Sequence, residues 1–323
     1  MMVPFFTILH PLVDACSVTV LVVGGMSWQR VLAYNALAFA LQFPLGVVLD
    51  ARPRWAKGTF VASLALTLLG VGLCALDAGD GEEAVVTQIA LVLACVGNAL
   101  FHLSAGKAVL DAHEGKGGPI GLFISTGALG LFAGMKLAGG YGLWCCLGFG
   151  VALAAVGAAA VLGFLGERAS RPFNTVTGCP VPARNGRDAR SPDDRPLSGW
   201  LILFGLFALV AWRSWAGLLA GGMTNAAGLG FALAGTAVTW AGKAAGGYLG
   251  DRFGCWIVTA VSVVGSLSLC FVCRPEQAAL WLALLFVAQL ATGPVLSLMY
   301  DKSGKASGTA FGLNCLALFT GSL

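Results

Sequence analysis

Eleven long apolar stretches, separated by short polar segments, make up most of the chain. Each is close to the roughly 20 residues that one helix needs to cross the hydrocarbon core of a bilayer. A segment exposed to lipid must satisfy its backbone hydrogen bonds internally, so each stretch predicts an α-helix. The expected spans are 3–25, 29–49, 58–76, 85–106, 118–138, 141–165, 199–221, 225–249, 255–273, 279–299 and 308–323. The pattern predicts an all-α polytopic membrane protein.

One long polar segment divides these spans into two sets. Residues 167–198 are rich in Arg, Pro, Gly and Asp and lack apolar periodicity, which is typical of a flexible linker. We expect an N-terminal six-helix bundle over 1–166, a cytoplasmic linker over 167–198 and a C-terminal bundle of five helices over 199–323. If the second half copies the first, a twelfth span is missing.

A helix end that runs from Gly into an acidic and basic turn occurs once in each half. Gly46 precedes Asp50 by four residues in QFPLGVVLDARPRWAKG, and Gly247 precedes Asp251 by four residues in GKAAGGYLGDRFG. A second pair of similar segments, GKGGPIGLFISTGALGLFAG from Gly115 and GKASGTAFGLNCLALFTGSL from Gly304, occurs in the same order. These matched pairs predict that one half is a duplicate of the other.

Composition and charge support the membrane assignment. Hydrophobic residues make up 58% of the chain and charged residues 11%, with a mean hydropathy of +0.84, which exceeds what one water-soluble core can bury. Most of the 19 basic residues fall in loops on one side, which places the N-terminus in the cytoplasm by the positive-inside rule. The net charge of +4 therefore reflects topology, and no nucleic-acid partner is expected. We expect a multi-pass protein of a bacterial inner (plasma) membrane.

Three ionisable groups lie deep inside expected spans, where a polar side chain usually faces a cavity or a partner. Asp14 lies near the middle of the first span and His10 lies one helical turn earlier on the same face. The couple could carry a proton, or it could be a static pair that holds two helices together. Arg213 lies midway along the seventh span and needs a carboxylate or an anionic ligand. It could pair with Asp14, bind a substrate acid or phosphate, or do both in turn.

The architecture and the repeated turn resemble the major facilitator superfamily of secondary transporters. The resemblance rests on six plus six helices, a long basic central loop and the motif G-x-x-x-D-R-x-G after the second helix of each half. The second copy matches closely through Gly247, Asp251, Arg252 and Gly254, whereas the first has Ala51 and Pro53 where Arg and Gly are usual.

Three further segments resemble the fosmidomycin-resistance-like branch of exporters. They are HPLVD at 10–14, FHLSAG at 101–106 and GKGGPIGLFISTGALG from Gly115. The chain has Leu103 and Ser104 where that branch usually has Pro and an acidic residue.

The resemblance implies which polar residues face a central cavity. In that fold the first, fourth, seventh and tenth helices line the cavity, which makes Asn98 and Gln289 expected substrate contacts. Trp212, beside Arg213, could flank an organic ligand. Lys243 aligns with Gln42 in the repeat and either faces substrate or extends to the surface. We interpret His102 as a gate or loop anchor.

The resemblance also implies a gate at the cytoplasmic surface. In that fold Asp50 and Asp251 approach the N-termini of the eleventh and fifth helices, whose free N–H groups a carboxylate can cap. Such contacts can hold the inner gate in one conformation and release it in the other. The remaining expected gating residues are Gly46, Arg52, Gly247, Arg252 and Gly254. The alternative is that these turns only fix topology.

The sequence contains no G-x-S-x-G, Walker or H-E-x-x-H motif, so neither an enzyme nor a cofactor is expected. We expect a monomeric, proton-coupled exporter of a small organic compound, which could be an anion, embedded in the lipid bilayer. A divalent-metal transporter using His10, Asp14 and His102 is an alternative, although Arg213 would repel a cation. A second alternative is a membrane scaffold or sensor that transports nothing, which the altered first turn and the missing span favour.

Overall fold

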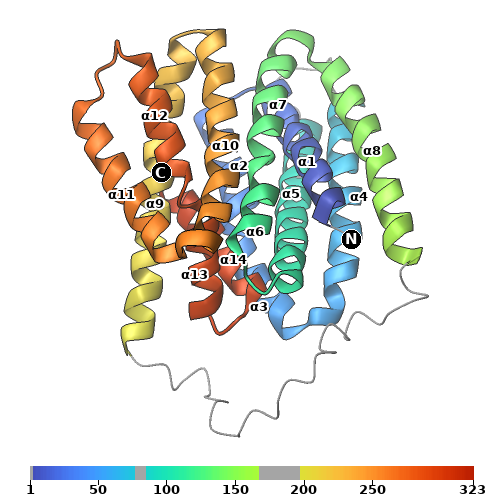
Figure 1. Ribbon diagram of the computed structural model, residues 1–323. Coiled ribbons are helices and arrows are strands. Elements are labelled where there is room, and N and C mark those ends of the chain that lie inside the picture. Colours follow the sequence, from blue (N-terminus) through green and yellow to red (C-terminus); the bar gives the residue numbers. More distant parts are fainter. Residues whose placement is uncertain (1–2, 77–84, 167–196) are drawn as a thin grey trace, which may run out of the picture.

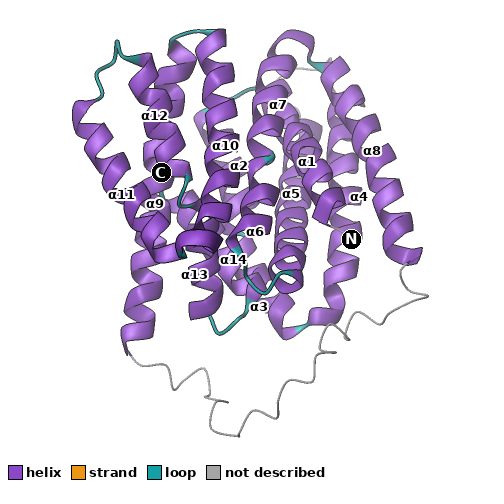
Figure 2. Cartoon of the chain, viewed as in Figure 1, coloured by secondary structure: helices purple, strands orange, loops and turns teal. Residues whose placement is uncertain are grey.

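The computed structural model describes residues 3–76, 85–166 and 197–323, and these residues form helices joined by short turns (Figures 1 and 2). The all-α prediction is confirmed. The α-helices are α1 (Val3–Val23), α2 (Trp28–Asn35), α3 (Gln42–Ala51), α4 (Ala56–Leu76), α5 (Val85–Ala112), α6 (Gly117–Ser125), α7 (Gly127–Tyr141), α8 (Leu143–Gly166), α9 (Leu197–Ala226), α10 (Leu229–Phe253), α11 (Cys255–Val272), α12 (Ala278–Gln289), α13 (Thr292–Lys302) and α14 (Ser307–Thr320). A π-helical turn, Ala36–Ala40, follows α2, and a 3₁₀ turn, Pro53–Trp55, precedes α4.

Nine of the eleven expected spans are long and apolar enough to cross a membrane within the described part of the chain. The other two, α10 and α14, are helical at the expected positions. Helix α14 has only 14 residues, and α10, although it has 25, is less apolar. The expected linker lies outside the described residues except for Leu197 and Ser198, which form the start of α9.

Three expected spans are interrupted rather than continuous. In the second span the π-helical turn separates α2 from α3. The fifth span breaks at Thr126 between α6 and α7, and the tenth breaks between α12 and α13. Proline explains two of these breaks, because its ring clashes with the carbonyl four residues earlier. Pro44 acts on Ala40, the last residue of the π-helical turn, and Pro294 acts on Leu290. Broken helices at mid-membrane are typical places for a binding site.

The most extensive contacts between the two halves, α1–α8 and α9–α14, are made by two pairs of helices, α3 with α14 and α6 with α10. Figure 1 shows α6 and α10 side by side near the centre of the bundle. Glycines allow both approaches: a Cβ on Gly46 would overlap the carbonyl of Gly308, and a Cβ on Gly247 would overlap the carbonyl of Gly117. Because α3 and α10 carry the repeated turn, as α6 and α14 carry the second repeat, the two contacts are equivalents of each other.

Candidate functional site

A cavity of about 500 Å³ lies between the two halves. Helices α1, α2, α5, α6 and α7 line one side, and α9, α10, α12, α13 and α14 line the other. The cavity begins near the middle of the bundle and extends toward Met26, Trp28 and Met135. These residues lie at the end of the bundle opposite Asp50 and Asp251. A second cavity of about 440 Å³, between α7, α9, α10 and α12, shares Leu131, Met135, Gly217 and Gln289 with the first. The larger cavity contains the candidate functional residues His10, Asp14, His102, Arg213, Lys243 and Gln289.

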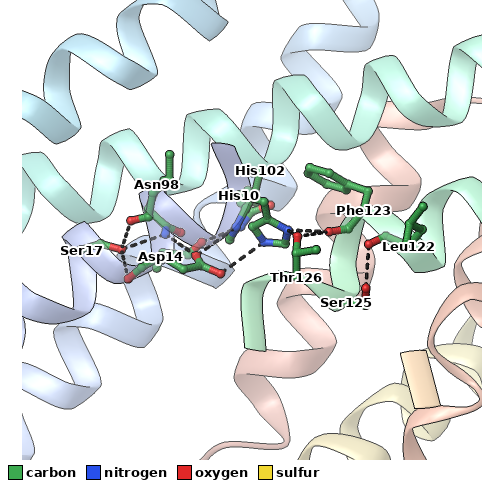
Figure 3. A network of polar contacts seen from close by, with 12 residues as sticks. His10, Asp14, Ser17, Asn98, His102, Leu122, Phe123, Ser125 and Thr126 are labelled. Atoms are coloured by element: carbon green, nitrogen blue, oxygen red, sulfur yellow. Dashed lines mark hydrogen bonds and ion pairs between the residues drawn. The ribbon is translucent and has the colours of Figure 1, made fainter. Parts of the chain in front are cut away.

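Asp14 is held by polar side chains from α1 and α5 (Figure 3). Its Oδ2 lies 3.2 Å from His10 Nε2 and its Oδ1 lies 3.1 Å from His102 Nε2. The side-chain amide of Asn98 donates to Asp14 Oδ1 at 2.8 Å and to the hydroxyl of Ser17 at 2.9 Å. All five residues are buried. The carboxylate is therefore fixed within the N-terminal half.

His10 is oriented by the break in the fifth span. Its Nδ1 lies 2.7 Å from the backbone oxygen of Phe123, and Figure 3 shows the ring between Asp14 and that carbonyl. The carbonyl lies in the last turn of α6, which ends at Ser125, and it also accepts from Thr126 Oγ1 at 3.0 Å. A carbonyl can only accept, so Nδ1 carries the hydrogen. Nε2 of a neutral His10 then presents a lone pair to a carboxylate oxygen, and the contact is favourable only with a cation: a proton on Nε2, or a metal ion.

The site needs a glycine at the start of α7. A Cβ on Gly127 would overlap the Asp14 carboxylate and lie within 3 Å of the His10 ring. The helix break and this glycine together bring the α6–α7 junction against the two ionisable groups.

His102 belongs to this cluster, so its interpretation as a gate or loop anchor is wrong. Its buried Nε2 lies 3.1 Å from Asp14 Oδ1, at ion-pair distance but without the geometry of a hydrogen bond. The sequence contained a signal for this, because Asn98 and His102 are four residues apart and therefore share a helix face.

Arg213 does not pair with Asp14. Its Nη1 donates to Gln289 Oε1 at 2.7 Å, and Thr292 Oγ1 donates to the same oxygen at 3.2 Å. Its Nε has no partner, and no carboxylate of the described chain forms an ion pair with it. Of the possibilities considered for Arg213, the bridge to Asp14 is absent, because His10, His102 and Asn98 already contact the carboxylate of Asp14. At 6% exposed, Arg213 is a buried cation without a counter-charge.

Lys243 adds a second cation to the same cavity. It lines the wall and lies close enough to Arg213 and Asp14 for their charges to interact. No carboxylate within the described ranges lies at ion-pair distance from it. Asn314 of α14, which the sequence analysis missed, also lines the cavity and has a buried side-chain oxygen without a partner. A lone Asn within an apolar span was its only signal.

Two expected substrate contacts do not line the cavity. Trp212 faces α11, where its Nε1 lies 3.4 Å from Ser266 Oγ, and its ring packs against Trp215 with the centroids 5.1 Å apart. Asn98 lies behind Asp14 and supports that side chain instead. Helix rotation explains both corrections, because position along a span does not define the face on which a side chain lies.

The acidic turns contact helices of the opposite half. Asp50 accepts hydrogen bonds from the N–H groups of Gly308 and Thr309, at 2.9 and 2.7 Å, and from Thr309 Oγ1 at 2.8 Å. Asp251 accepts from the N–H groups of Gly117 and Gly118, at 2.7 and 2.8 Å. Asp50 thus caps the N-terminus of α14, and Asp251 caps the N-terminus of α6. This is the placement that the resemblance implied.

The basic residues of the two turns take no part in these caps. The guanidinium of Arg52 lies 5.2 Å from the ring centre of Trp55, and that of Arg252 lies 5.5 Å from the ring centre of Phe253. Lys107 of α5 instead donates to Asp50 and to Ser307, each at 2.8 Å. Gly254, with φ +97°, makes the turn between α10 and α11.

Comparison with solved structures identifies the architecture. The fucose:proton symporter FucP of E. coli in a structure of the outward conformation has a TM-score of 0.66 at 15% identity, over 98% of this chain and 89% of that chain. A single-residue variant of FucP has a TM-score of 0.65 at 14% identity, over 98% and 88%. The chain has the major facilitator superfamily fold. A bacterial homologue of the iron transporter ferroportin, in an outward-facing state, has a TM-score of 0.57 at 13% identity, over 100% and 89%.

At these identities the likeness shows the major facilitator fold alone. No protein-family model and no curated protein sequence matches the chain. The likeness to the fosmidomycin-resistance-like branch therefore stays a prediction. The three solved structures are of transporters, not enzymes.

Proposed function

We propose that the protein is a secondary active transporter that exports a small organic anion across the membrane by alternating access, coupled to protons. The observation that carries the proposal is that two cations, the buried Arg213 and the half-buried Lys243, lie in a cavity between the two halves with no carboxylate of the described residues at ion-pair distance. A charge buried without a partner is costly, and side chains of this kind inside a membrane usually mark a substrate or ion pathway. An anionic substrate would supply the missing counter-charge.

The His10–Asp14 contact supports coupling to protons. With Nδ1 committed to the Phe123 carbonyl, a proton on Nε2 turns this contact into a charge-assisted hydrogen bond. Loss of that proton leaves a lone pair facing the carboxylate and favours rearrangement of α1 against the α6–α7 junction. A fucose:proton symporter has the same fold, which adds support by analogy. Export rests on the resemblance of HPLVD and FHLSAG to an exporter branch.

The capped helices are a suitable gate. Asp50 and Asp251 join the halves at one end, while the cavity extends toward the other. The positive-inside rule assigns the capped end, and the N-terminus, to the cytoplasm of a bacterial inner membrane. In this conformation the inner gate is closed. Opening it requires both carboxylates to leave the helix N-termini as the halves, 1–166 and 199–323, rock about the cavity in a monomer, with 167–198 as their linker.

A second candidate is transport of a free divalent cation. His10, Asp14 and His102 offer one ligand atom each, all within 4.8 Å of one another, and a homologue of an iron transporter has a similar fold. Arg213 and Lys243 in the same cavity oppose this candidate, because they would repel an uncomplexed cation.

Proton flux and substrate exchange in proteoliposomes test the proposal. A pH gradient is imposed, a panel of small organic anions is added, and the wild type is compared with Asp14→Asn and with Trp212→Phe, which alters a side chain outside the cavity. We expect anion-dependent proton flux in the wild type and in Trp212→Phe. In Asp14→Asn we expect at least a tenfold loss of flux, with anion exchange at equal pH retained. Absence of flux and of exchange with every anion, in protein that remains folded, would contradict the proposal.

A further inference from the structure

Three buried side chains on one wall of the cavity form a ligand set for a transition metal. His10 and His102 present imidazole nitrogens and Asp14 presents a carboxylate oxygen, with all three atoms within 4.8 Å of one another. Two imidazoles and a carboxylate suit divalent ions such as Zn²⁺, Fe²⁺ and Co²⁺ rather than Mg²⁺ or Ca²⁺. Because all three residues line the cavity, further coordination positions would face its interior.

The surroundings orient these groups as a metal site requires. His10 Nδ1 donates to the Phe123 carbonyl, which directs Nε2 toward Asp14, and Asn98 holds Asp14 Oδ1. Metal ligands are typically fixed by outer hydrogen bonds of this kind. His102 Nε2 is buried and lies 3.1 Å from Asp14 Oδ1 without the geometry of a hydrogen bond. An imidazole nitrogen and a carboxylate oxygen in this arrangement can both bind one metal ion.

The charge of the cavity determines what must accompany a metal ion. A divalent ion on Asp14 leaves one positive charge, to which Arg213 and Lys243 add two more. Like charges gathered in a weakly screened site repel strongly. A small chelating anion resolves this, because some of its oxygens can complete the coordination of the metal while others face the two basic side chains. A cavity of about 500 Å³ has room for such a complex.

We propose that the cavity binds a divalent transition-metal ion at His10, Asp14 and His102 together with a small chelating anion that faces Arg213 and Lys243. The inference deepens the proposed function and rests on it for the anion, since it makes a metal–anion chelate the substrate class. The metal site itself depends only on the three ligands.

Equilibrium dialysis of the detergent-purified full chain tests the proposal with radiolabelled Co²⁺ and radiolabelled citrate, each counted alone and together. We expect Co²⁺ to bind the wild type, and citrate to be retained with it at equal stoichiometry but at least tenfold more weakly without it. His102→Gln, and separately His10→Gln, should lower the retention of both labels at least tenfold. Arg213→Gln should lower citrate retention at least tenfold while Co²⁺ alone still binds. Trp212→Phe serves as the matched control.

Any one of three results would overturn the proposal. The first is Co²⁺ retention that neither His10→Gln nor His102→Gln lowers, the second is no Co²⁺ retention by the wild type, and the third is citrate retention independent of Co²⁺. Elution as a single species in size-exclusion chromatography shows that each variant is folded. Because no membrane gradient is involved, these outcomes are separate from failure of the proposed transport. Metal-free anion flux in proteoliposomes without Co²⁺ retention would sink this inference and leave the proposed function standing. Retention of Co²⁺ and citrate without any flux would support this inference and contradict the proposed transport function.

Discussion

The carboxylate of Asp251 in the second half accepts the backbone N–H of Gly117 in the first half at 2.7 Å. Its equivalent, Asp50, accepts the N–H of Gly308 at 2.9 Å, so each half caps one helix of the other. The two contacts differ in one respect, because Lys107 reinforces Asp50 and no basic side chain of the described residues pairs with Asp251. We therefore expect the Asp251 contact to be the weaker one and the first to open.

Removing the charge of Asp251 should loosen the N-terminus of α6. Asp251→Asn replaces two charge-assisted hydrogen bonds by at most weaker neutral ones, at a cost of about 1–3 kcal/mol. Hydrogen exchange of the peptide containing Gly117 and Gly118, followed by mass spectrometry, should become at least fivefold faster. Asp301→Asn changes an exposed carboxylate at the same end and should leave the rate unchanged. Equal rates in Asp251→Asn and wild type would show that the cap does not hold this end closed.

The helix pair α3–α14 should not tolerate a methyl group at its crossing. A Cβ on Gly46 would overlap the Gly308 carbonyl, so Gly46→Ala forces the backbones apart at a cost of about 1–3 kcal/mol. The apparent melting temperature in detergent should fall by several degrees. Gly58→Ala on α4 is the matched control, because nothing lies within 4 Å of its added Cβ. That variant should match or exceed the wild type, since Ala is the better helix former. A Gly46→Ala protein as stable as Gly58→Ala would contradict the close packing.

Local sequence signals predicted the architecture well, and their limits are physical. Apolar length defined the spans, and the repeated Gly and Asp positions identified both turns that cap helices of the opposite half. The interruption at Thr126 has no proline four residues later, so nothing in the local pattern marks it. Pro294 does mark the interruption near Leu290, which the expected continuous span 279–299 did not include.

The candidate site was predicted only in part, because its contacts join distant helices. His10 and Asp14 lie on one helix, so their contact followed from spacing alone. The partner of Arg213 is Gln289, 76 residues away, and depends on how α9 and α12 rotate against each other. Trp212 illustrates the same limit, since a neighbouring position on a helix turns by about 100° and can leave the cavity altogether.

Arg213 should govern affinity for the anion rather than the rate of conformational change. Arg213→Gln removes the buried positive charge, and Arg213→Lys keeps the charge but loses the planar fork that reaches Gln289. In anion exchange at equal pH, we expect KM to rise at least tenfold in Arg213→Gln and less in Arg213→Lys, with a smaller change in kcat. A loss confined to kcat in both variants would place Arg213 in the conformational change and not in the binding site.

The glycine at the start of α7 should be essential for the cluster but not for folding. A Cβ on Gly127 would overlap the Asp14 carboxylate, so Gly127→Ala must displace Asp14 or His10 from the other. Both groups would then lose the geometry by which the cluster holds a proton or a metal ion, and we expect anion-dependent proton flux and Co²⁺ retention each to fall at least tenfold. Gly139→Ala changes the same helix where nothing lies within 4 Å of the added Cβ, and both measurements should match the wild type. If Gly127→Ala retained full flux, the Asp14–His10 contact would be dispensable for coupling. The pair would then act as a structural link between α1 and the α6–α7 junction.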